Sequence, residues 1–216
     1  MTGIWPWVTL ALLGVYHGAN PGMGWLFAVA LGLQEKSGAA VLRALVPIAI
    51  GHAASVGITV AALVIGKVSL SSSIVTYATA GALIAFGMVK LVRPRHPRWV
   101  GMRVGFRDLV LWSFLMATAH GAGLMLLPVF LFNADNPAPC HGAGCHTAAG
   151  LTLTSPAGYF AAVGIHTLAM LVAAAIIAIV VYYKFGLSLL RHAWFNLDRV
   201  WALALVAAGI VAILLH

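Results

Sequence analysis

Long stretches without any charge are the feature that most constrains this chain. No Asp, Glu, Lys or Arg occurs between Met1 and Glu35, and the 216 residues are 62% hydrophobic and 7% charged. A soluble domain carries about 25% charged residues, so this chain has too few charges to cover a water-facing surface. We therefore expect one integral membrane domain over residues 1–216, surrounded by membrane lipid.

Six stretches are long and apolar enough to cross a bilayer as helices. A span needs about 20 apolar residues to cross roughly 30 Å of hydrocarbon, and the first stretch is too long for the apolar region of a signal peptide. The predicted spans are residues 6–31, 41–65, 73–92, 107–132, 157–183 and 197–215. The expected fold class is an all-α polytopic membrane protein with six transmembrane helices.

The positions of the basic residues predict the orientation of these spans. Lys67 is the only basic residue on its side of the predicted membrane, although the chain has 12 Lys and Arg. The others fall in loops one, three and five: Lys36, Arg43, Lys90, Arg93, Arg95, Arg98, Arg103, Arg107, Lys184, Arg191 and Arg199. The positive-inside rule places these loops in the cytoplasm and both termini outside. We expect a bacterial-type inner membrane and, since the charge lies in loops, no nucleic-acid partner.

Three pairs of short segments repeat in the same order in the two halves. "YHGANPG" matches "AHGAGLM", "IGHAASV" matches "GIHTLAM", and "AFGMVKL" matches "AAGIVAIL". We predict two inverted three-helix repeats, about 4–95 and 107–216, joined by a basic cytoplasmic loop at 90–107, with an outer loop at 133–156. Secondary transporters of this plan bind their substrate near the midplane, between the repeats. Chance similarity in a glycine-rich chain is the alternative.

One histidine lies deep in each of four predicted spans. His17, His52, His120 and His166 fall about nine to thirteen residues into their spans, which is near the bilayer centre. Ionisable residues at this depth are rare and usually face a bundle interior or a cavity. We interpret the four as one shared binding site. Neutral histidines hydrogen-bonded to neighbouring helices are the alternative.

A break in the first span adds polar groups beside His17. Asn20 follows it by three residues and is therefore expected on the same helix face. Pro21 has no N–H, so we expect the His17 carbonyl to lack its helical partner and to face the site. A packed kink without a ligand is the alternative.

The ligand types favour a transition metal. No Asp or Glu lies inside a predicted span, which disfavours sodium, magnesium and a carboxylate-bridged di-iron centre. Imidazole suits Ni, Co, Zn, Cu or Fe, and haem held by the same histidines stays open. Histidine also relays protons. The methionines that could add soft ligands, or simply pack, are Met23, Met116, Met125 and Met170.

The long outer loop carries a second group of thiols and imidazoles. Cys140 and Cys145 enclose a short loop, and each is followed by a histidine, His141 and His146. On the oxidising side of a membrane the cysteines are expected to form a disulfide. Capture of a thiophilic metal by all four side chains is the alternative.

The segments around His17 and His52 resemble a known family. "YHGANPGM" followed by "IGHAASV" is similar to the nickel–cobalt exporter branch of the lysine exporter superfamily, over residues 10–60 and more weakly over 113–170. The resemblance implies six or so spans in two related halves and export of a divalent metal. Met23 stands where that family tends to have a second histidine.

These observations predict a small secondary transporter or exporter of a transition-metal cation. The binding residues would be His17, Asn20, His52, His120 and His166, with alternating access between the repeats. We expect a transporter rather than an enzyme. A membrane metal- or haem-binding redox protein, and an accessory subunit of a larger membrane complex, are the alternatives. Homo-oligomeric assembly stays open.

Overall fold

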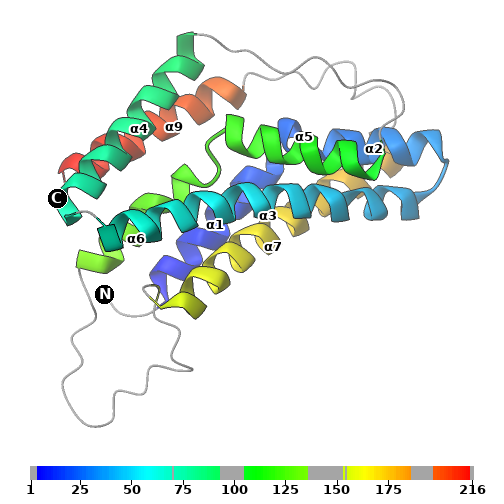
Figure 1. Ribbon diagram of the computed structural model, residues 1–216. Helices are drawn as coiled ribbons and strands as arrows, with labels where there is room; N and C mark the ends of the chain where they lie inside the picture. The colour runs from blue at the N-terminus through cyan, green and yellow to red at the C-terminus, as the bar shows by residue number, and fades with distance from the viewer. Residues whose placement is uncertain are drawn as a thin grey trace.

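The protein is built from helices throughout the part that the computed structural model describes. That part comprises residues 4–69, 71–92, 105–135, 153, 155–185 and 197–214, and no strand occurs within it. This confirms the all-α prediction for these ranges (Figure 1). The elements are α1 (Trp5–Ala19), η1 (Pro21–Met23), α2 (Trp25–Gln34), α3 (Gly38–Ser69), α4 (Ser72–Val92), α5 (Phe106–Ala119), η2 (Leu124–Leu126), α6 (Leu127–Asp135), α7 (Pro156–Val180), the π-helical turn η4 (Val181–Phe185) and α9 (Leu197–Leu214).

Two helices are long and apolar enough to cross a membrane. One apolar segment is Gly38–Gly66 within α3, and the other is Pro156–Lys184, which covers α7 and continues into η4; each has 29 residues. The helices α5 and α6 form a third candidate if the pair is counted as one bent span, with an angle of 48° between its parts. The apolar composition and these lengths make the protein membrane-associated.

The predicted spans 6–31 and 107–132 are both broken near their middle, and the sequence indicated the first of these breaks through Pro21. Between α1 and α2 the chain makes a 3₁₀ turn and then adopts a φ of 111° at Gly24. Between α5 and α6 it adopts a φ of 67° at Gly121. Both values lie in the left-handed region, which glycine reaches without steric cost. Each break follows directly on a histidine-bearing turn.

The helices pack in pairs that join distant parts of the sequence. Helix α1 lies along α7, α3 lies along both α5 and α7, and α4 lies along α9 (Figure 1). Glycines allow the closest approaches, as is common between membrane helices. A Cβ on Gly18 would overlap the Met170 carbonyl, and a Cβ on Gly51 would overlap the Val110 carbonyl. The pairs α1–α7 and α3–α5 are therefore in backbone contact.

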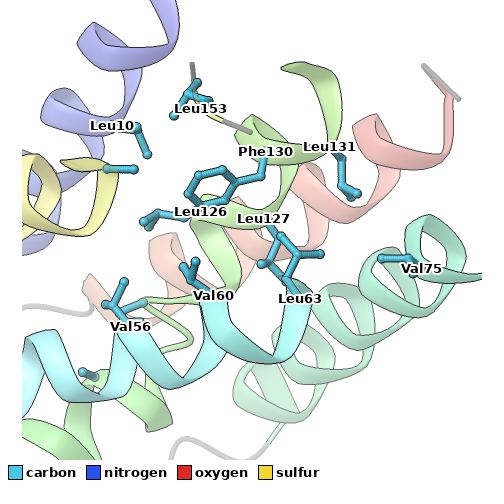
Figure 2. Close-up of a cluster of buried hydrophobic side chains, with 13 residues drawn as sticks. Leu10, Val56, Val60, Leu63, Val75, Leu126, Leu127, Phe130, Leu131 and Leu153 are labelled. Atoms are coloured by element: carbon cyan, nitrogen blue, oxygen red, sulfur yellow. The ribbon is translucent and has the colours of Figure 1, made fainter. Parts of the chain in front are cut away.

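Two large apolar clusters fill most of the interior between these helices, and a smaller one contains Leu83, Met125 and Leu205. The Phe130 cluster (Figure 2) contains Leu10, Val56, Val60, Leu63, Val75, Ala117, Ala122, Leu126, Leu127, Phe130, Leu131, Leu153 and Ala162. The Ile48 cluster contains Trp25, Ala28, Val29, Val41, Ala44, Leu45, Ile48, Leu109, Met170, Ala174, Ala178 and Val181. Helices α3 and α7 contribute to both clusters, so each runs through the whole interior.

The backbone contact at Gly51 makes a prediction about stability. We expect Gly51→Ala to lower the free energy of unfolding in detergent by about 1–3 kcal/mol, because the new methyl group meets backbone that cannot rotate away. Gly57→Ala on the same helix is the control, since no atom from a neighbouring helix among the described residues lies within 4 Å of its Cβ position. Thermal unfolding of both variants measures the difference, and equal effects would contradict the packing described.

Candidate functional site

The four predicted histidines are all buried, and they come from four different helices. His17 lies in the last turn of α1, His52 in α3, His166 in α7, and His120 ends α5. Their side chains are at most 2% exposed. Interior imidazoles on separate helices can meet only where those helices pack together.

Three of these rings form a compact group, which we call the histidine cluster. The ring centroids of His17 and His52 are 4.9 Å apart, those of His52 and His166 are 5.4 Å apart, and those of His17 and His166 are 5.9 Å apart. The ring of His120 lies beside the turn that follows His17, with its Cε1 3.4 Å from the Cβ position of Gly22. Thus side chains separated by more than a hundred residues in the sequence share one small volume.

Two of the histidines are oriented by backbone carbonyls. The Nδ1 of His166 lies 3.2 Å from the Leu10 carbonyl of α1, and the Nδ1 of His120 lies 2.8 Å from the Met116 carbonyl. A carbonyl oxygen only accepts, so each Nδ1 carries the proton and each Nε2 carries a lone pair. This tautomer, fixed by a carbonyl behind the ring, is the usual arrangement of a metal-binding histidine.

Buried nitrogen atoms in the cluster have no hydrogen-bond partner among the described residues. This holds for Nε2 of His166 and for both ring nitrogens of His52. A buried polar atom without a partner costs about 1–3 kcal/mol, so native proteins rarely keep several together. These nitrogen atoms are therefore suited to a ligand that accepts their lone pairs.

The histidine cluster lies between the two apolar clusters. Along α3, His52 follows Ile48 of the Ile48 cluster and precedes Val56 of the Phe130 cluster. Along α7 the order is reversed, since His166 follows Ala162 and precedes Met170. Apolar side chains thus separate the imidazoles from both ends of the helix bundle.

The break beside His17 differs from the prediction in one respect. The His17 carbonyl does not lack a partner, because the backbone N–H of Asn20 donates to it at 3.1 Å. Helix α1 ends at Ala19, and the carbonyl of that residue accepts from the Trp25 indole at 3.3 Å. The chain therefore tightens into a 3₁₀ turn, and the prediction of an exposed His17 carbonyl is wrong.

Asn20 stabilises the break itself. It is the buried C-cap residue of α1, directly after Ala19, and its Oδ1 accepts from the Gly22 N–H at 2.9 Å. The same oxygen lies 3.3 Å from the Cβ position of Gly22, and Cε1 of His120 lies 3.4 Å from that point. Asn20 is thus near His120, which agrees with one shared site. It follows the last residue of α1, so it does not lie on the helix face of His17 as predicted.

The cluster as it stands is not a formed metal site. Within the described ranges, no three His, Cys, Asp or Glu side chains are arranged to hold a metal ion. Three imidazoles around one ion, at a metal–nitrogen distance of about 2.0 Å, would have ring centroids about 5 Å apart. The observed separations are close to this value, so rotation of the rings rather than movement of the helices would bring the nitrogens together.

Two features of the site were beyond the reach of sequence reasoning. The Leu10 carbonyl, which holds His166, gives no signal in the sequence because any residue has a carbonyl. Ser113 donates its hydroxyl to the Ile48 carbonyl at 2.6 Å and so fastens α5 to α3 beside the cluster. Ser113 lies one turn before Ala117 and two turns before His120, on the same face of α5, and this spacing was the only sign in the sequence that it faces the interior.

The second predicted group, Cys140, His141, Cys145 and His146, lies outside the described residues. The disulfide and the metal site proposed for it therefore stay predictions.

Comparisons with protein-family models, with curated proteins and with solved structures find no match to this chain.

The orientation of His166 makes a prediction about its tautomer. In the ¹⁵N spectrum of histidine-labelled protein, we expect His166 to show a protonated Nδ1 and a lone pair on Nε2, because Nδ1 donates to the Leu10 carbonyl. The spectrum of His166→Gln assigns the signal. A protonated Nε2 would contradict the arrangement.

Proposed function

We propose that the protein is a small secondary transporter that carries a transition-metal cation across a membrane. The cation binds to His17, His52, His120 and His166 near the midplane, and Asn20 contributes beside them. Six spans form two inverted repeats, and access alternates between the two sides of the membrane. The resemblance to the nickel–cobalt exporter branch of the lysine exporter superfamily agrees with this proposal.

The observation that carries the proposal is a group of buried imidazole nitrogens that lack hydrogen-bond partners. Both nitrogens of His52 and Nε2 of His166 are in this state among the described residues, and the two ring centroids are 5.4 Å apart. Imidazole nitrogen suits nickel, cobalt, zinc, copper and iron. A cation shared by these rings would replace the missing hydrogen bonds.

The helix pairing supports the inverted repeat. In the proposed repeat, α1 corresponds to α5, α3 to α7 and α4 to α9. The pair α1–α7 therefore corresponds to the pair α5–α3, and the pairs α3–α7 and α4–α9 each correspond to themselves. All these pairs pack together. The two broken segments, α1–α2 and α5–α6, also correspond, and broken helices at the binding site are common in transporters with inverted repeats.

The two apolar clusters support alternating access. With both clusters closed, a cation in the histidine cluster would be shielded from water on each side. Separation of the Phe130 cluster alone would open one route, and separation of the Ile48 cluster alone would open the other. The left-handed glycines Gly24 and Gly121 lie where the broken helices change direction, which suits them as hinges.

Transport by purified protein in liposomes tests the proposal. We expect His17→Ala and His120→Ala to reduce uptake of Ni²⁺, Co²⁺, Zn²⁺ or Cu⁺ by more than about tenfold, because each loses a ligand. Thr76→Val is the control, since Thr76 is a buried polar residue of α4 outside the cluster.

Unchanged transport in both histidine variants, with the fold intact, would overturn the proposal. An absorption spectrum of the same preparation provides a second readout. A haem band in that spectrum would favour a membrane redox protein over a carrier.

The proposed orientation is tested by cysteine labelling in a chain whose Cys140 and Cys145 are changed to Ser. Lys36 and Ser71 are both exposed and lie at opposite ends of α3. With the basic loops in the cytoplasm, we expect a membrane-impermeant maleimide to label Ser71→Cys in intact cells. Lys36→Cys should react only after permeabilisation, and the reverse pattern would contradict the orientation.

A further inference from the structure

Buried thioethers accompany the histidines of the proposed site. Met116 lies one helical turn before His120 on α5, and Met170 lies one turn after His166 on α7. Their side chains are 1% and 0% exposed. Residues four apart share a helix face, so each of these two helices presents an imidazole and a thioether to the interior together.

The contacts around the broken segment bring one thioether close to the site. The Met116 methyl carbon lies 3.3 Å from the Cβ position of Gly22, and Cε1 of His120 lies 3.4 Å from the same point. Met170 lies at the closest approach of α7 to α1, where its carbonyl contacts Gly18, the residue that follows His17. The thioether of Met116 is therefore beside the break that follows α1, and the Met170 backbone is packed against α1 one residue after His17.

The charge of the ligand set restricts the charge of the cation. Among the described residues the acidic side chains that have a determined exposure, Glu35 and Asp108, are both exposed. The groups around the cluster are imidazoles, thioethers, an amide and carbonyls, all of which are neutral ligands. The cost of removing an ion from water rises with the square of its charge, so a divalent ion costs roughly four times as much as a monovalent one. Because Glu35 and Asp108 are exposed, neither offsets that cost in the interior, and a monovalent ion is favoured.

The number and softness of the ligands point the same way. Structural zinc sites usually bind four Cys, His, Asp or Glu side chains, whereas the proposed ligand set combines imidazoles with thioethers. Monovalent copper accepts two or three ligands, and soft thioether sulfur selects it over nickel, cobalt and zinc. Neutral, soft ligands in small number match this ion.

We propose that the transported cation is monovalent copper, or silver in its place, held by the imidazoles of the histidine cluster together with the thioethers of Met116 and Met170. This inference rests on the proposed transport function and names its substrate.

Competition binding in detergent tests the inference with Ag⁺, which is stable in air, and with Zn²⁺ and Ni²⁺ as divalent probes. We expect wild-type protein to bind Ag⁺ at least about tenfold more tightly than either divalent ion. Met116→Leu and Met170→Leu conserve volume, and each should weaken Ag⁺ binding about tenfold while leaving Zn²⁺ binding unchanged. Met125→Leu is the control, because Met125 is a buried methionine that packs in a separate group with Leu83 and Leu205.

The outcomes separate the two proposals. If both methionine variants bind Ag⁺ like wild type while His52→Ala loses it, the thioether ligands are wrong and the histidine site stands. If Ni²⁺ or Zn²⁺ binds more tightly than Ag⁺, the monovalent substrate is wrong. If His52→Ala binds every probe like wild type, the proposed transport site itself fails.

Discussion

Three imidazole rings packed within 4.9–5.9 Å of one another are the constraint on which the site depends. Each ring comes from a different helix, and α7 packs against both α1 and α3, so the three rings meet where these helices come together. Their positive forms would repel strongly at such short distances in an interior of low dielectric constant. Both ring nitrogens of His52 and the Nε2 of His166 have no hydrogen-bond partner among the described residues. A fold that retains this arrangement gains little stability from it, which is the reason to assign it a function.

The broken helices follow from the same arrangement. A continuous helix through His17 would leave its carbonyl without a partner, because Pro21 has no N–H. The chain instead forms a 3₁₀ turn after α1, in which Asn20 and Trp25 satisfy the backbone groups that the break exposes. The second break, after His120, needs a left-handed residue, and Gly121 supplies it. Both breaks are therefore turns with hydrogen bonds of their own, at the point where two helices approach the cluster.

The sequence predicts more of this fold than of the site. Apolar length alone indicated the helices, and counting into each span correctly indicated that His17, His52, His120 and His166 are buried. The breaks were harder to predict, because Pro21 marks one of them but nothing distinguishes Gly121 from the other glycines. Which rings touch, and which carbonyl orients His166, depends on the crossing of helices that are far apart in the sequence. Local periodicity carries no information on such crossings. The predicted free carbonyl of His17 is wrong for a local reason, because the Asn20 N–H donates to it in the 3₁₀ turn.

The most direct test of the site is an X-ray absorption spectrum of the protein loaded with one equivalent of Ag⁺. The wild-type spectrum should show at least two imidazole ligands together with sulfur, and His52→Ala and His166→Ala should each lose imidazole scattering. A spectrum with no imidazole ligand, unchanged in both variants, would contradict the central claim that the buried histidines bind the cation.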